Sequence, residues 1–137
     1  MIIASTSLVG CTETHHREVD QRLRERFHID APPGARLDSA VPQAVLHGVP
    51  PGSSIGTVYA YLDAHGFRRH PSDTPSTDSN YYLPLDDSRH VVASMNDYRP
   101  HWYSPVDVCD LDDRLIFTFD LAGNLSSLIL ERHGYCI

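Results

Sequence analysis

The spacing of apolar residues predicts one helix clearly, in the middle of the chain. Its apolar positions recur at i, i+3, i+4 and i+7, the spacing of one helix face, and they are Ile55, Val58, Tyr59 and Leu62. Ser53 or Ser54 can accept a hydrogen bond from a free amide of the first turn. Gly66 stands where a left-handed residue ends a helix, and Phe67 then meets Leu62 as in a Schellman motif. The start, the face and the end therefore agree on a helix.

Segments of alternating or β-prone residues follow this helix and predict an antiparallel sheet. Residues 80–85 and 90–98 read as strands, although Val92 interrupts the polar face of the second. Two further runs, 114–119 and 125–130, flank Ala122-Gly123-Asn124, a sequence suited to a tight hairpin. The pattern predicts an α+β fold, in which a three- to four-stranded antiparallel meander packs against one main helix.

The expected hairpin sets a register that includes two cysteines. If Ala122 and Gly123 are the two loop residues, opposed residues have numbers that sum to 245, as in the pairs Phe117–Leu128, Leu115–Leu130 and Ile116–Ile129. Cys109 and Cys136 also satisfy this sum, and 110–113 is where a bulge would break it. We therefore predict a disulfide between Cys109 and Cys136, worth about 3–4 kcal/mol in the loop-entropy model. The alternative is two separate buried thiols in a cytosolic protein.

The first part of the chain is less regular. Residues 12–30 have the spacing of a solvated helix, with a narrow apolar stripe formed by Val19, Leu23 and Phe27. Residues 31–52 contain five prolines and predict a linker without a long helix, in which 44–49 forms at most a short edge strand. The expected organisation is a candidate truncated signal segment at 1–10, an N-terminal helix or stalk at 11–30, this linker at 31–52, and the α+β domain at 53–137.

Composition and charge narrow the classes of partner. The net charge is −7, the charges are mixed along the chain, and all eleven basic residues are Arg. This composition argues against nucleic-acid binding, which favours a concentrated basic surface. No apolar run approaches the roughly 20 residues of a membrane-spanning helix. Membrane attachment would therefore need something smaller than a spanning helix.

Cys11 is a candidate site of lipid attachment, because Leu8-Val9-Gly10-Cys11 has the pattern of a bacterial lipobox. A lipobox directs cleavage before the cysteine and transfer of a diacylglycerol to its thiol. Only ten residues precede Cys11 and none is basic, whereas signal peptides usually have about 15–30 residues and a positive start. Two alternatives remain open: a true start further upstream, or an accidental match in which Cys11 ends a buried first strand.

Together these features resemble the small outer-membrane lipoproteins of the SmpA/OmlA (BamE-like) type, over roughly residues 49–132 beyond the lipobox. The matching residues are Leu-Val-Gly-Cys at 8–11, Pro-Gly-Ser-Ser at 51–54, Val58 and Leu62, Phe-Thr-Phe-Asp at 117–120, Gly123 and Leu125. The resemblance implies a lipid-anchored protein on the periplasmic face of the outer membrane that binds other envelope proteins. Thr12, rather than Asp, after the cysteine is similar to lipoproteins sent to the outer membrane.

The nine histidines lie in no metal-protease motif. The sequence contains no His-Glu-x-x-His and no Cys-x-x-Cys, and its one Gly-x-Ser-x-Gly match, from Gly52 to Gly56, overlaps the expected N-cap of the central helix. We therefore predict a protein that is not an enzyme, with no catalytic residues, no metal and no cofactor. The alternative is a hydrolase built from scattered pairs such as His101 with Asp97 or His133 with Glu131.

A protein-binding surface is the remaining expectation. One segment combines the only Trp with Tyr and Arg, residue types that are enriched at binding hot spots: Tyr98, Arg99, His101, Trp102 and Tyr103. In the alternative interpretation Trp102 folds back to cap the core. The main hypothesis is a non-catalytic envelope lipoprotein that binds an envelope protein. A cytosolic inhibitor or immunity-type protein, whose acidity would suit a basic partner, is the second. The oligomeric state is left open.

Overall fold

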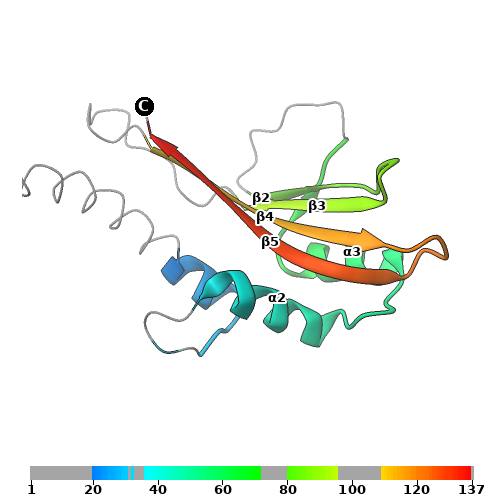
Figure 1. The fold of residues 1–137 in the computed structure, drawn as a ribbon, viewed down its shortest axis with the longest axis horizontal. Coiled ribbons are helices and arrows are strands. Elements are labelled where there is room, and N and C mark those ends of the chain that lie inside the picture. The colour runs from blue at the N-terminus through cyan, green and yellow to red at the C-terminus, as the bar shows by residue number, and fades with distance from the viewer. Residues whose placement is uncertain (1–19, 31, 33–35, 72–79, 96–108, 137) are drawn as a thin grey trace, which may run out of the picture.

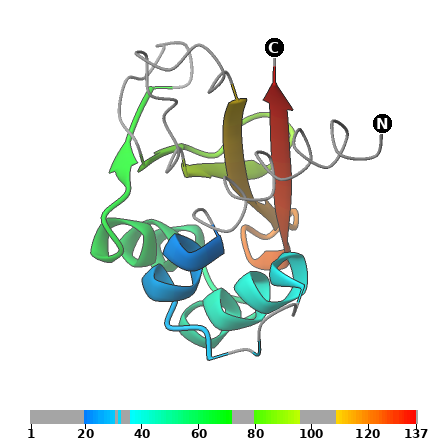
Figure 2. The same cartoon turned by 90° about the vertical axis from the view of Figure 1, so that its left-hand side faces the viewer.

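The computed structural model describes residues 20–30, 32, 36–71, 80–95 and 109–136, with the main chain alone at 109–112 and 133–136. The protein has an α+β fold, as predicted. Within the described residues, helical segments lie on one face of a five-stranded mixed sheet (Figures 1 and 2). The expected arrangement was one main helix and an additional N-terminal helix against three or four antiparallel strands. It lacked one helix, at 37–48, and one strand, at 68–69.

Helix α3, Ile55–Ala64, forms as the sequence predicts. The Ser54 hydroxyl accepts a hydrogen bond from the amide of Thr57 at 3.2 Å. At the other end Gly66 has φ +83°, and the amide of Phe67 donates to the carbonyl of Leu62 at 3.0 Å. These are the bonds of a Schellman motif, and both Leu62 and Phe67 are buried.

Helix α2, Leu37–Gly48, contradicts the expected linker and the expected edge strand at 44–49. Pro42 lies inside this helix, where it removes one amide donor. The loss is offset by burial, because an apolar stripe at intervals of four residues enters the core: Leu37, Val41, Val45 and, just beyond the helix, Val49. The pyrrolidine ring of Pro42 is itself buried beside this stripe. The linker prediction was wrong because it gave the prolines of 31–52 more weight than this apolar stripe.

The N-terminal helix is described from residue 20 and ends at residue 26, not at 30 as expected. Leu23 and Phe27 belong to the hydrophobic core, so the predicted stripe packs on the domain. An ion-pair cluster reinforces this contact. Arg132 of strand β5 (Leu125–Cys136) binds Asp20 at 2.6 Å, and it binds Asp113 of strand β4 (Cys109–Phe119) at 2.9 Å. Asp113 is only 3% exposed, so the ion-pair cluster that joins the helix to the sheet includes a buried carboxylate.

The strands follow one another across the sheet in the order β1-β2-β3-β4-β5. Their bounds are Arg68–Arg69, Asn80–Leu83, His90–Met95, Cys109–Phe119 and Leu125–Cys136. Strands β2 to β5 pair antiparallel, whereas β1 pairs parallel with β2 and makes the sheet mixed. Strand β1 lies outside the segments that were predicted to be strands.

The β4–β5 register agrees with the predicted sum of 245 from Cys109–Cys136 to Thr118–Ser127. The expected two-residue loop Ala122-Gly123 is wrong, because the pair next to the turn, Phe119–Leu125, sums to 244 and the bulge beside it restores the predicted sum. The irregularity lies between Thr118 and Phe119, beside the turn, and not in the segment 110–113 where a bulge was considered. In Figure 1 the two strands extend beyond β2 and β3 as a two-stranded ribbon. The ribbon exists because β3 pairs only with residues 113–118 of β4.

Candidate protein-binding surface

The sheet has one face that the described helices leave uncovered. Along each strand the side chains alternate between the two faces, and the core takes Tyr82, Val91, Phe117 and Leu128 from the helix side. The neighbours of these residues therefore point to the opposite side. One of them, Ile129, is 53% exposed.

Apolar residues on this uncovered face form a continuous row across four strands. The register makes each one the direct neighbour of the next: Leu83, Val92, Ile116 and Ile129. We call these four residues the open-face row. With strands about 4.8 Å apart the row spans about 14 Å. Its first three members are partly exposed, so the exposed Ile129 belongs to a continuous apolar stripe and is not an isolated surface residue.

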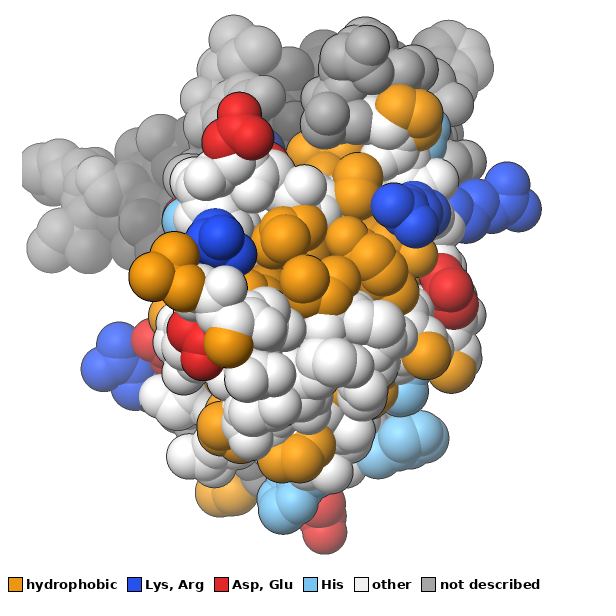
Figure 3. Space-filling model, turned by 90° about the vertical axis from the view of Figure 1, so that its right-hand side faces the viewer, with side chains coloured by type: hydrophobic (Ala, Val, Ile, Leu, Met, Phe, Trp, Pro, Cys, Tyr) orange, Lys and Arg blue, Asp and Glu red, His pale blue; other side chains and the backbone are white. Residues whose placement is uncertain are grey.

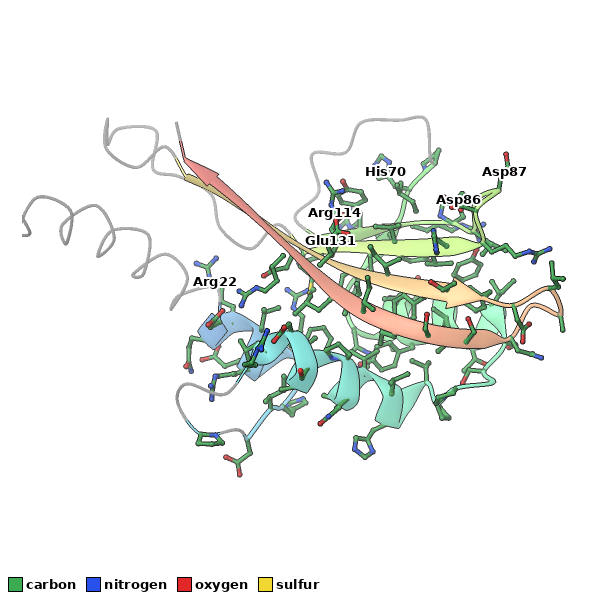
Figure 4. All side chains as sticks on the ribbon, viewed as in Figure 1. Arg22, His70, Asp86, Asp87, Arg114 and Glu131 are labelled. Atoms are coloured by element: carbon green, nitrogen blue, oxygen red, sulfur yellow. The ribbon has the colours of Figure 1, made fainter. Side chains whose placement is uncertain are left out.

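Polar residues border the open-face row on both sides. One border is Tyr81, Ser94, Arg114 and Glu131, and the other is His90, Thr118 and Ser127. Figure 4 shows Arg114 and Glu131 together near the middle of the sheet, with Asp86 and Asp87 at the β2–β3 turn. An apolar centre with a polar rim is the usual composition of a protein-binding surface.

A space-filling view supports the presence of exposed apolar surface. Figure 3 looks at the end of the molecule that carries the hairpin turns. Hydrophobic side chains gather near the centre of this view, with Arg side chains to either side. This end of the molecule thus combines apolar area with flanking charge.

The turns beside the row are fixed by aspartates. The Asp86 carboxylate accepts hydrogen bonds from the Ser88 hydroxyl at 2.7 Å and from the amides of Ser88 and His90. The Ser88 hydroxyl is the main reason that the pKa of Asp86 is lowered. In the β4–β5 turn the Asp120 carboxylate accepts from the amides of Ala122 and Asn124 in the same way. Because the Oδ1 atom of each carboxylate accepts bonds from local donors, these aspartates hold the turns.

A second polar cluster joins α3 to the sheet on the helix side. The Tyr82 hydroxyl donates to the Asp63 carboxylate at 2.9 Å, and the ring of Tyr82 stacks on Tyr59 at 5.5 Å. The Arg69 guanidinium lies 4.8 Å from the centre of the Tyr59 ring. Burial, and then the bond to Asp63, raise the pKa of Tyr82 to about 12. These contacts explain how the helix is held against the sheet.

Most of the site residues predicted from the sequence lie outside the described part of the chain. Cys11 and the five residues of the expected binding segment between Tyr98 and Tyr103 are among them. Cys109 and Cys136 are described by their main chain, which places them directly opposite each other in the β4–β5 ladder. Within the described residues, no group of three His, Cys, Asp or Glu side chains could hold a metal ion.

The open-face row was missed at the sequence level, although its parts were visible. The Ile116–Ile129 pair follows from the predicted hairpin register, and Val92 stood out as an apolar residue on a polar face. What the sequence lacked was the β3–β4 register, which aligns Val92 with Ile116. Chain-distant pairing of this kind leaves no local signal.

Comparison with protein-family models, with curated proteins and with solved structures found no match to this chain. None of the helices that the structure describes is long and apolar enough to cross a membrane. The functional argument therefore depends on the geometry of the chain itself.

Proposed function

We propose that this chain is a small, non-catalytic protein-binding domain of the bacterial cell envelope, which contacts its partner through the open-face row. The observation that carries the proposal is the alignment of four apolar residues across the uncovered face of the sheet. Burying such a row on a partner would release water from apolar area at about 25 cal/mol per Å² before the costs of association. The polar residues on both sides of the row would orient the partner on this surface.

The envelope location rests on the cysteines. The main-chain register sets Cys109 opposite Cys136, and opposed residues of an antiparallel pair have Cα atoms about 4.5–5.5 Å apart, within the range of a disulfide. A bridge there favours an oxidising compartment. Cys11, with its lipobox pattern, would then carry the lipid on the periplasmic face of the outer membrane, as in the SmpA/OmlA-type lipoproteins that the sequence resembles.

Photo-cross-linking tests the binding surface directly. A photoreactive amino acid at Ile116 should give a cross-linked protein product in a Gram-negative host, and the same group at Gln43, exposed on α2, should not. The product at position 116 should disappear when Val92→Glu is added, because a carboxylate in the row must be desolvated on binding. Equal products at positions 116 and 43, or a product insensitive to Val92→Glu, would contradict the proposal.

The intact mass of the protein from the same host tests the location. We expect cleavage before Cys11, an added acyl group and the loss of two hydrogens from the remaining thiols. A mature protein that retains residues 1–10 and three alkylatable thiols would exclude export by this route. The binding surface and the location are thus tested independently.

A further inference from the structure

Strand β5 forms one edge of the sheet, and its outer side is paired only at its start. The amide and carbonyl of Leu125 bond to the carbonyl of Ser53 and the amide of Gly52, each at 2.8 Å. Beyond Leu125 no strand in the described part of the chain pairs with this edge. The unpaired amides and carbonyls of an edge strand are a template for another strand.

The residues of this edge do not oppose such pairing. From Leu125 to Leu130 the strand contains no charged residue and no proline, the two features that most often protect edge strands. Ser126, Ser127 and Ile129 are exposed. The irregularity of the β4–β5 pairing lies at the start of β5, and from Ser127 onward the register is regular. Within the described residues, the free edge is therefore regular in register, neutral and without a pairing strand where it borders the open-face row.

We propose that two copies of this chain pair antiparallel through β5, in a register centred on Ile129. This inference goes beyond the proposed function, because the second copy pairs at the edge of the sheet and the open-face row stays available to the partner. In this register Ile129 of one copy lies opposite Ile129 of the other, and Ser127 lies opposite Glu131. The pairing runs from Ser126 to Arg132, since the outer side of Leu125 is already bonded to Gly52 and Ser53. The two open-face rows then become one apolar row across a continuous sheet, and the two-fold symmetry closes the assembly at a dimer.

Other registers are less favourable for identifiable reasons. A shift that moves the centre to Leu128 sets Ile129 opposite Ser127, and one that moves it to Leu130 sets Ile129 opposite the charged Glu131. A shift that sets Ile129 opposite Leu128 or Leu130 would bring the open face of one copy beside the helix face of the other. Of these registers, only the centre at Ile129 sets the two open-face rows in line on the same face of the sheet.

Charge does not prevent the association, although each chain carries −7. The charged residues nearest the axis on the open face are the two Glu131 side chains. They stand four residues apart along the paired strands, which is about 13 Å. This distance exceeds the screening length of about 8 Å at physiological salt. A single pair of strands buries a small area, so we expect association in the micromolar range.

Sedimentation equilibrium on the full 137-residue chain tests the dimer. We expect reversible dimers, and Ile129→Lys should weaken them at least about tenfold, since the charge would be desolvated at the axis. Leu121→Lys is the matched control, because Leu121 is 87% exposed and lies in the β4–β5 turn away from the free edge. A native chain that stays monomeric at high micromolar concentration, or an equal effect of the two substitutions, would overturn the inference.

Disulfide trapping tests the register. Ile129→Cys should link to itself under mild oxidation, and a mixture of Ser127→Cys and Glu131→Cys chains should form the mixed dimer, identified by peptide mapping against the native chain. Leu121→Cys should give no specific link. Failure of Ile129→Cys to link while the native chain dimerises would place the interface elsewhere. If the chain is monomeric but residue 116 cross-links to another protein, only this inference fails and the proposed function stands.

Discussion

At the scale of single residues, Gly48 is required by a close approach between α2 and α3. A Cβ atom at this position would lie 2.6 Å from Cε2 and 2.9 Å from Cδ2 of Tyr61. The Tyr61 ring cannot move freely, because it stacks on His65 at 3.9 Å. We therefore expect Gly48→Ala to lower the free energy of unfolding by about 1–3 kcal/mol, the usual cost of overpacking.

Gly56→Ala is the control for this experiment, since its Cβ would meet only the Ser54 hydroxyl at 3.9 Å. It lies within helix α3 and should raise the free energy of unfolding by about 0.5–1 kcal/mol, because alanine favours the helix. Urea unfolding of both variants provides the comparison. A Gly48→Ala protein as stable as the Gly56→Ala protein would mean that the α2–α3 contact is looser than described.

Tyr82 supplies a prediction about alkaline pH. Loss of its bond to Asp63 in Tyr82→Phe should cost about 1 kcal/mol at neutral pH, because Asp63 stays exposed to water. The native phenol has its pKa raised from 10.0 to about 12. Its contribution to stability is therefore complete below pH 10 and is lost as the pH rises toward 12. Urea unfolding of both proteins across this range should show the deficit of the variant shrinking; a constant deficit would contradict the assignment.

At the scale of secondary-structure elements, Arg132 connects the N-terminal helix with strands β4 and β5. Burial lowers the pKa of Arg132, but the bonds to Asp113 and Asp20 outweigh this effect and raise it overall. Arg132→Met should reduce the free energy of unfolding by about 3–5 kcal/mol, because Asp113 would keep its buried charge without the guanidinium. Thermal or urea unfolding measures the loss.

Asp20→Asn is the control for the Arg132 cluster, because the Asp20 side chain is 37% exposed and its charge is screened by solvent. We expect a loss of about 0.2–1 kcal/mol from this variant. Similar losses from Arg132→Met and Asp20→Asn would show that the helix contact, and not the burial of Asp113, determines the contribution of the cluster.

The elements also differ in how far the sequence predicts them. Helix α3 was predictable because its cap, its apolar face and its final glycine are all local signals. Helix α2 was not, since the five prolines of 31–52 outweighed its apolar stripe, although Pro42 removes only one donor. The β4–β5 register came out as predicted although the assumed two-residue turn was wrong, because the bulge beside the turn offsets the longer loop. Strand β1, two residues long, depends on pairing with a distant strand and has no local pattern.

At the scale of the whole molecule, the strand pairing that forms the sheet also forms the open-face row. The order of the strands makes β5 an edge, and the register sets four apolar residues in line on the uncovered face. Neither feature can be obtained from one segment alone. The sequence therefore predicted candidate residues in local clusters, whereas the surface that the structure supports is assembled from four separate strands.

The ribbon formed by 109–112 and 133–136 gives the last prediction. No described strand supports it beyond residue 113, and isolated two-stranded ribbons are marginally stable in water. A disulfide between Cys109 and Cys136 would close the ribbon at its end. We expect the oxidised chain to be lighter by two hydrogens and more stable than the reduced chain by about 3–4 kcal/mol. Mass spectrometry and thermal unfolding with and without reductant measure both effects, and Cys136→Ser should abolish the difference. If reduction changed neither mass nor stability, the opposed cysteines would be free thiols and the case for an oxidising compartment would lose its structural support.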